Sequence, residues 1–139
     1  MEKFDATGGA FTSADQEDRW TYHAGTIDAL RSTCATPAVQ REAAGYRFEY
    51  WIDTSDATSP WYVAVFGRNG VLVGFLSFGP RGDVLLANEV AVRKAFRRRG
   101  IASAMYSLGE HATQRKFIPS SRASPYGAAF WANRCARMH

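Results

Sequence analysis

Residues 84–106, VLLANEVAVRKAFRRRGIASAMY, change from one hydrophobic pattern to another around three arginines and a glycine. The first part, VLLANEVAV over residues 84–92, follows a turn sequence and is mostly apolar, which is typical of a β-strand. From about Arg99 to Arg115 the apolar residues recur at helical spacing, and they are Ile101, Met105, Leu108 and Ala112. The stretch therefore predicts a strand, a tight basic turn and a helix in direct succession.

The turn has the properties of an anion site. A helix that begins within a residue or two of Gly100 has unpaired N–H groups with partial positive charge in its first turn. Gly100 lacks a side chain, so an anion can approach the backbone, and Ala102 and Ser103 keep the next turn small. The guanidinium groups before it suit phosphate oxygens, and they belong to Arg97, Arg98 and Arg99. We predict a diphosphate site here; the alternatives are a solvated helix end and a basic patch for nucleic acid.

The segments before this stretch predict further strands joined by short turns. Aromatic and β-branched residues alternate over residues 46–53, and apolar runs follow at 61–66 and 71–78. An Asn-Gly step between the last two is a strong hairpin signal. With the strand described above, these segments predict an antiparallel meander of four strands. Residues 117–120, FIPS, are expected to add a short strand parallel to the fourth one, reached through the helix.

Helices are expected at both ends of the chain. Ser13 or Thr12 can cap a first helix that runs to about Ala35. A proline can open a second short helix over residues 37–44. A final helix is expected to begin near Pro125, which can occupy its first turn.

Together these elements predict a single α/β domain over residues 1–139 with a mixed, mostly antiparallel sheet. Residues 1–45 would form a helical N-terminal part and residues 46–92 the strand meander. Residues 93–139 would hold the basic turn, its helix, the short strand and the final helix. The strand, helix and parallel strand make a βαβ unit, and we expect helices on both faces of the sheet.

Charge is unevenly distributed along the chain, whose net charge is +4. Residues 1–92 carry 7 Lys and Arg against 12 Asp and Glu, whereas residues 93–139 carry 10 basic residues against Glu110 alone. The positive field therefore lies in the last third of the chain. It would attract an anion, either a phosphorylated cofactor or nucleic acid.

Composition argues against several classes of protein. No apolar run approaches the roughly 20 residues that cross a bilayer, and the first residues lack the pattern of a secretion signal. We therefore expect no membrane partner and a cytoplasmic protein, or one packaged in a virion if it is phage-encoded. Cys34 and Cys135 are expected to be reduced thiols. The spacing of the histidines predicts no metal site, and His23 and His111 are expected on helix surfaces.

The motif Arg97-x-x-Gly100-x-Ala102, directly after a strand that ends in Glu89-Val-Ala-Val92, resembles the acetyl-CoA signature of GNAT-type N-acetyltransferases. The resemblance covers residues from about 60 to 134. It implies a GNAT-like fold, acetyl-CoA as cofactor and an amine as acceptor. It also implies that N–H groups at the end of the strand bind the pantetheine arm and polarise the acetyl carbonyl. The implied cofactor-binding residues of this unit are Val90, Ala91, Val92, Arg97, Arg98, Arg99, Gly100, Ile101, Ala102 and Ser103.

Further along, PYGAAFWANR at residues 125–134 resembles the ending of small bacterial and phage members of the family. Ser124 stands where the family often has an Asn that contacts the cofactor. Trp131 stands where it often has a Tyr that protonates the departing thiolate, and an indole cannot act as a general acid. Tyr126 is therefore our candidate acid. Glu89, on the strand beside the site, is our candidate base.

Two other functions stay open at this point. The substituted Asn and Tyr positions, and the expected absence of the family's last two strands, fit a catalytically inactive GNAT-like structural or interaction protein. The basic last third also fits a nucleic-acid-binding module, although the position of the arginines after an apolar strand favours a cofactor site. A homodimer or another protein partner could supply the missing strands through an exposed sheet edge.

Overall fold

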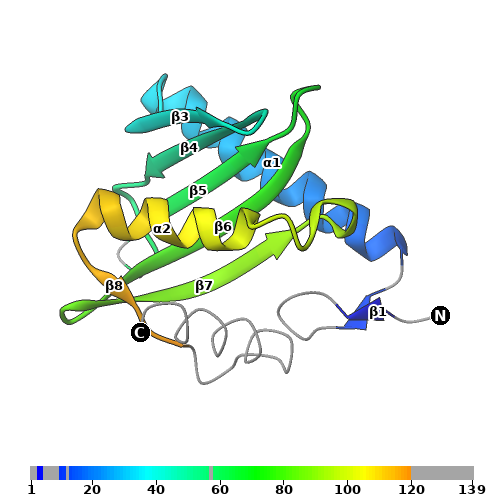
Figure 1. The fold of residues 1–139 in the computed structure, drawn as a ribbon. Helices are drawn as coiled ribbons and strands as arrows, with labels where there is room; N and C mark the ends of the chain where they lie inside the picture. Colours follow the sequence, from blue (N-terminus) through cyan, green and yellow to red (C-terminus); the bar gives the residue numbers. More distant parts are fainter. Residues whose placement is uncertain (1–2, 5–9, 12, 57, 120–139) are drawn as a thin grey trace.

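The computed structural model describes residues 3–4, 10–11, 13–56 and 58–119 of the chain (Figure 1). The strands in these residues are β1 (Lys3–Phe4), β2 (Ala10–Phe11), β3 (Val39–Ala43), β4 (Tyr46–Ile52), β5 (Trp61–Phe66), β6 (Leu72–Arg81), β7 (Val84–Val92) and β8 (Lys116–Phe117). The helices are α1 (Ser13–Cys34), the short 3₁₀ helix η1 (Lys94–Phe96) and α2 (Ile101–Thr113). None of these helices is long and apolar enough to cross a membrane.

One six-stranded sheet organises the chain, with its strands in the order β3-β4-β5-β6-β7-β8. Strands β3 to β7 are antiparallel neighbours, whereas β8 runs parallel to β7, as the sequence predicts. Because α2 lies between β7 and β8 in the chain, these three elements form the predicted βαβ unit. Strands β1 and β2 form a separate antiparallel pair.

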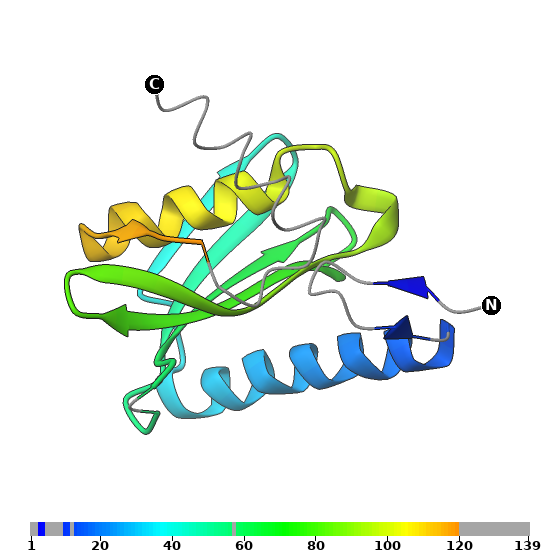
Figure 2. The same ribbon diagram turned by 90° about the horizontal axis from the view of Figure 1, so that it is seen from below.

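Helices α1 and α2 cover opposite faces of the sheet, which passes between them (Figure 2). Helix α2 packs through the predicted apolar face, where Ile101, Met105 and Leu108 are buried in one core with strands β4 to β8. Gly74 of β6 permits this contact, because a Cβ atom there would lie 3.0 Å from Ile101 Cγ2 and 3.2 Å from Met105 Sδ. The α2 face is therefore a closely packed apolar layer.

Helix α1 covers the other face with fewer apolar side chains. Trp20, Ile27 and Leu30 are buried there, together with residues of β4 to β7 that include Trp51 and Phe75. Their spacing along α1 places them on one side of the helix. Charged residues of α1 reach the sheet on either side of this apolar strip, as described below.

The predicted helix over residues 37–44 is wrong, because Val39–Ala43 is strand β3. Its residues pair with β4 in antiparallel register from Val39 with Tyr50 to Ala43 with Tyr46. The intervening Ala44 and Gly45 both have positive φ, at 54° and 85°, which is the backbone of a tight hairpin turn. Pairing with β4 therefore overrides the local preference that residues such as Gln40 and Glu42 have for helix.

Two other boundaries differ slightly from the prediction. Strand β6 continues through Pro80 to Arg81, beyond the predicted run at 71–78, so only two residues separate it from β7. Strand β8 begins one residue earlier than predicted, at Lys116. Helix α1 agrees with the expected first helix, and α2 lies within the predicted range. The predicted final helix lies outside the described residues.

Candidate functional site

A β-bulge lies immediately before the predicted binding strand end. The pairing of β6 with β7 shifts between Ser77 and Phe78, which leaves Asn88 as an extra residue on β7. The Asn88 amide nitrogen is 3.4 Å from the Ser77 hydroxyl oxygen. A bulge bends its strand and changes the direction of the groups that follow it. Residues 89–92 therefore continue β7 in a new register.

The new register determines which backbone groups of β7 point away from β6. The N–H group of Arg93 donates to the carbonyl of Val73 on β6, at 2.9 Å. Hydrogen-bonded and non-bonded pairs alternate along an antiparallel ladder. The N–H and C=O groups of Ala91 therefore point toward β6, whereas those of Val90 and Val92 point away from it. The register therefore narrows the predicted backbone donors on this strand to Val90 and Val92.

Strand β8 lies beside only the first part of β7 (Figure 1). Its pairing involves Val84 and Leu85 and stops there. Glu110 of α2 helps to hold β8, because its Oε2 atom accepts the N–H of Phe117 at 2.9 Å. Within the part of the chain that the structure describes, no strand pairs with the outward edge of residues 89–92. That edge can therefore accept an extended ligand through its backbone groups.

The basic turn connects this edge to α2. The Arg97 side chain folds back on the strand, and its Nε atom donates to the carbonyl of Val92 at 3.0 Å. Gly100 has φ of 78°, a left-handed conformation that L side chains rarely adopt. A Cβ atom at Gly100 would meet nothing within 4 Å. The backbone at Gly100 is thus exposed at the beginning of the helix.

The first turn of α2 presents backbone N–H groups beside Gly100. The N–H of Ala104 makes the bond to the Gly100 carbonyl, at 2.9 Å. The N–H groups of Ile101 and Ala102, which come earlier in the helix, have no acceptor within it. They carry the positive end of the helix dipole, which favours an anion such as phosphate. Ile101 can contact such an anion only through its backbone, since its side chain is buried in the α2 core.

The three arginines of the turn differ in what they contact. Arg97 is bound to the strand as described, whereas Arg99 donates to the Tyr46 hydroxyl at 3.3 Å and lies over the Phe96 ring at 5.3 Å. Arg98 is exposed and has no ion-pair partner among the described residues. The sequence has no acidic residue from Arg93 to Gly109. The surface around Gly100 therefore carries positive charge without a local counter-charge from that segment.

Glu89, the candidate base, lies one residue before Val90 and on the α1 side of the sheet. Its Oε1 atom accepts a hydrogen bond from Nε of Arg19 at 3.0 Å and lies 2.7 Å from Nη2 of the same guanidinium in an ion pair. The Nε2 atom of His23 lies 3.8 Å from the same oxygen. His23 stacks on Phe75 with ring centroids 4.1 Å apart and is buried rather than on the helix surface as predicted. The structure thus brings Glu89 next to two side chains of α1.

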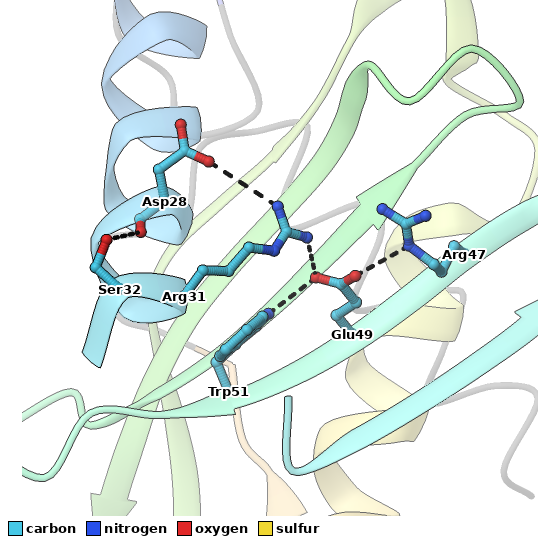
Figure 3. Close-up of polar contacts among 6 residues, drawn as sticks. All are labelled: Asp28, Arg31, Ser32, Arg47, Glu49 and Trp51. Carbon is cyan, nitrogen blue, oxygen red and sulfur yellow. Dashed lines mark hydrogen bonds and ion pairs between the residues drawn. The ribbon is translucent and has the colours of Figure 1, made fainter. Parts of the chain in front are cut away.

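A second glutamate on the α1 side, Glu49 of β4, has a different environment (Figure 3). Its Oε1 atom accepts from Arg31 at 2.6 Å and from the Trp51 indole N–H at 3.1 Å. Its Oε2 atom accepts from Arg47 at 2.9 Å. Glu49 is buried, with 3% of its surface exposed. Both of its oxygens are occupied, so this cluster ties the end of α1 to the sheet and leaves no atom for a ligand.

Burial raises the pKa of two tyrosines of the sheet above their ordinary value. It raises the pKa of Tyr50 to about 12. Burial also raises the pKa of Tyr62, and the nearby charges of Asp56 and Asp53 act in the same direction. Both phenols therefore remain protonated at neutral pH.

The structure brings the predicted residues of the 89–103 segment together around the end of β7 and the beginning of α2. The other predicted site residues, Ser124, Tyr126 and Trp131, lie outside the described residues. Arg19 was not among the predicted site residues. The signal that could have indicated it is its spacing of four from His23, which places both side chains on one side of α1. The described residues contain no cluster of side chains that could hold a metal ion.

This strand, bulge, turn and helix are consistent with the fold of GNAT-type acyltransferases, and the comparison with protein families agrees. The model of the acetyltransferase (GNAT) family matches residues 25–120, which is more than half of the chain. The chain belongs to the acetyltransferase (GNAT) family. The matched range contains the curved sheet from β3 to β8 and the whole β7–α2 connection. No curated protein and no solved structure gives a significant match to the chain.

Proposed function

We propose that this protein transfers an acetyl group from acetyl-CoA to an amine. The observation that carries the proposal is the continuity between two features on one surface. The outer edge of β7 at residues 89–92, with which no strand of the described residues pairs, leads directly into the exposed N-terminus of α2 at Gly100. A ligand with an extended amide-containing arm and a diphosphate matches these features in that order.

The residues present fit acetyl-CoA. The outward backbone groups of Val90 and the outward N–H of Val92 would bind the amides of the pantetheine arm, as an added strand would. The N–H groups of Ile101 and Ala102 would bind the diphosphate, with the side chains of Arg98 and Arg99 beside it. Open space at Gly100 supports this fit, because even a Cβ atom there would touch nothing within 4 Å.

The three arginines and Ser103 would then act in different ways. Arg97 would shape the site by holding the Val92 carbonyl, while Arg98 and Arg99 would supply positive charge. Ser103 would contribute the small side chain that the first helical turn requires near a phosphate. Acetyl-CoA, when bound, supplies an acetyl group activated as a thioester.

Glu89 would act on the acceptor as the general base. An amine is mostly protonated at neutral pH and becomes nucleophilic after it loses a proton. Glu89 is on the strand that would hold the reacting end of the cofactor, and 22% of its side-chain surface is exposed. Tyr126 remains the candidate acid, and Ser124 and Trp131 remain candidate cofactor contacts, on the strength of the sequence resemblance alone.

Thermal denaturation with and without acetyl-CoA tests the binding step. We expect micromolar acetyl-CoA to raise the Tm of the wild-type protein, because a ligand that binds the folded state stabilises it. Two variants form a matched pair: Gly100→Asn and Gly100→Asp have similar size, and both residues tolerate positive φ better than most. The Asn variant should retain most of the Tm shift, and the Asp variant should lose it through repulsion of phosphate.

Release of free thiol from acetyl-CoA tests the transfer step. Suitable acceptors are an α-amino acid, a polyamine, an aminoglycoside and a lysine-containing peptide. Thiol release that depends on one of these amines supports the proposed reaction. A Tm shift with no amine-dependent thiol release would instead indicate a protein that binds acetyl-CoA without turnover. Equal shifts for the two Gly100 variants would contradict the placement of the diphosphate.

A further inference from the structure

We propose that Arg19 of α1 is a positioning residue that fixes the orientation of the Glu89 carboxylate; this inference rests on the proposed function. The Arg19 guanidinium donates a hydrogen bond from Nε to Glu89 Oε1 at 3.0 Å, and its Nη2 atom lies 2.7 Å from the same oxygen in an ion pair. The two residues are 70 positions apart in the sequence. The contact therefore joins the beginning of α1 to the strand that forms the site.

The surroundings of Oε1 differ from those of Oε2. His23 lies 3.8 Å from Oε1, and its ring is held by stacking on Phe75. Arg19 and His23 thus occupy the space around Oε1. Among the interactions of the described residues, none involves Oε2 of Glu89. Oε2 is therefore the atom that can accept a proton from an acceptor ammonium.

Holding one oxygen of Glu89 matters because proton transfer requires the other oxygen to point toward the acceptor amine. A glutamate side chain on a partly exposed strand has several rotatable bonds and would sample several orientations. A guanidinium held against one oxygen through Nε and Nη2 fixes the position of that oxygen and so limits rotation of the carboxylate. In the step we infer, Oε2 takes a proton from the acceptor ammonium, which leaves a neutral amine and a neutral carboxylic acid. Arg19 keeps its own protons and its bonds to Oε1 throughout.

The Glu49 cluster shows what a purely structural arginine–glutamate contact looks like in the same protein. Arg31 also comes from α1, and it binds Glu49 Oε1 at 2.6 Å. The second oxygen of Glu49 is occupied by Arg47, and the carboxylate is buried. Glu89 differs in having one oxygen fixed and the other available. This difference assigns a positioning role to Arg19 rather than to Arg31.

The test measures kcat and KM by thiol release with the fastest amine of the four acceptors named above. For Arg19→Gln we expect kcat to fall by about 10- to 100-fold, since a small misplacement of a catalytic group costs on this order. The KM for acetyl-CoA should change by less than about 3-fold, because the proposed role of Arg19 is to orient the base and not to bind the cofactor. Arg19→Lys should recover part of kcat, because an ammonium can bind Oε1 without the two-donor geometry.

Glu17→Gln is the matched control. Glu17 is also on α1 and forms an ion pair with a residue just beyond β7, Arg93, at 3.2 Å, but it does not contact Glu89. Its side chain is 73% exposed, so the loss of this pair should change neither kcat nor Tm appreciably. The acetyl-CoA-induced Tm shift should be the same in wild type, Arg19→Gln and Glu17→Gln. This readout is independent of turnover.

A double-mutant cycle decides whether Arg19 acts through Glu89. If it does, adding Arg19→Gln to Glu89→Gln should lower kcat by less than about 2-fold, because the group being positioned is already absent. An equal loss of kcat in both backgrounds would overturn the proposal, as would wild-type kcat in Arg19→Gln alongside an impaired Glu89→Gln. Absence of both thiol release and a Tm shift in the wild-type protein would instead overturn the proposed function and the inference with it.

Discussion

Glu49 and Glu89 are two carboxylates on the same side of the sheet, and each is bound by an arginine of α1. Glu49 lies under the end of the helix and uses both oxygens, in bonds to Arg31, Arg47 and the Trp51 indole. Glu89 lies under the beginning of the helix and uses one oxygen. A fully bonded buried carboxylate fastens two elements together, whereas a half-bonded one at an open strand edge can still exchange a proton.

The two faces of the sheet differ in a similar way. The α2 face is an apolar core that includes Phe78, Leu76 and Met105, each less than 2% exposed. The α1 face combines a smaller apolar cluster with ion pairs that join the helix to β4 and β7. The apolar face gives β7 and α2 a fixed relative position. The polar face supplies the titratable groups beside the site.

The largest effect is expected from Glu89→Gln. This change keeps the size of the side chain but removes its ability to accept a proton, so kcat should fall by about 100-fold or more. Because the Arg19 contact is partly exposed, Tm should change little. Thiol release and thermal denaturation measure the two quantities. A Glu89→Gln protein with wild-type kcat would show that Glu89 does not act as the base, and the contrast with Glu49 would then have no functional meaning.

The same substitution at Glu49 should have the opposite pattern. Glu49→Gln leaves one of the guanidinium contacts facing an amide NH₂ group inside a buried cluster. We expect a loss of about 2 kcal/mol in the free energy of unfolding. The kcat measured well below the lowered Tm should stay within about 2-fold of wild type. A large loss of kcat without a loss of stability would mean that Glu49 belongs to the reaction.

Arg47→Met should have a smaller effect than either glutamate variant. The guanidinium of Arg47 is partly exposed, binds Glu49 Oε2 and lies 4.9 Å from the centre of the Phe66 ring. Methionine retains the apolar stem, so we expect a loss of about 1 kcal/mol, measured by urea denaturation. A loss as large as that of Glu49→Gln would indicate that Arg47, rather than Arg31, dominates the cluster.

The sequence predicts most of the sheet and the succession of β7, basic turn and α2, because these segments carry strong local signals. Residues 61–66 and 84–92 are mostly apolar runs bounded by turns, and the apolar spacing from Ile101 to Ala112 is helical. Gly100 stands at the position that requires positive φ. Local patterning and the observed structure agree in these segments, so the position of the basic turn follows from the sequence.

Other features depend on contacts between distant segments and could not be predicted in this way. Strand β3 has a composition compatible with helix, and its pairing with β4 determines its conformation. Asn88 is disfavoured in strands, but a single such residue does not indicate a bulge. The contact between Arg19 and Glu89 spans 70 positions and exists only because α1 packs across β7. The fold was therefore easier to predict than the groups around the candidate base.

An NMR titration of the ¹⁵N-labelled protein with CoA tests the central claim, the position of the cofactor site, most directly. CoA lacks the acetyl group, so the spectra report binding without turnover. We predict large shifts for the backbone amides of Val90, Val92, Ile101 and Ala102, and an unchanged indole N–H signal for Trp51 in the Glu49 cluster. Unchanged amides at these four positions, at CoA concentrations that saturate any binding, would contradict the account.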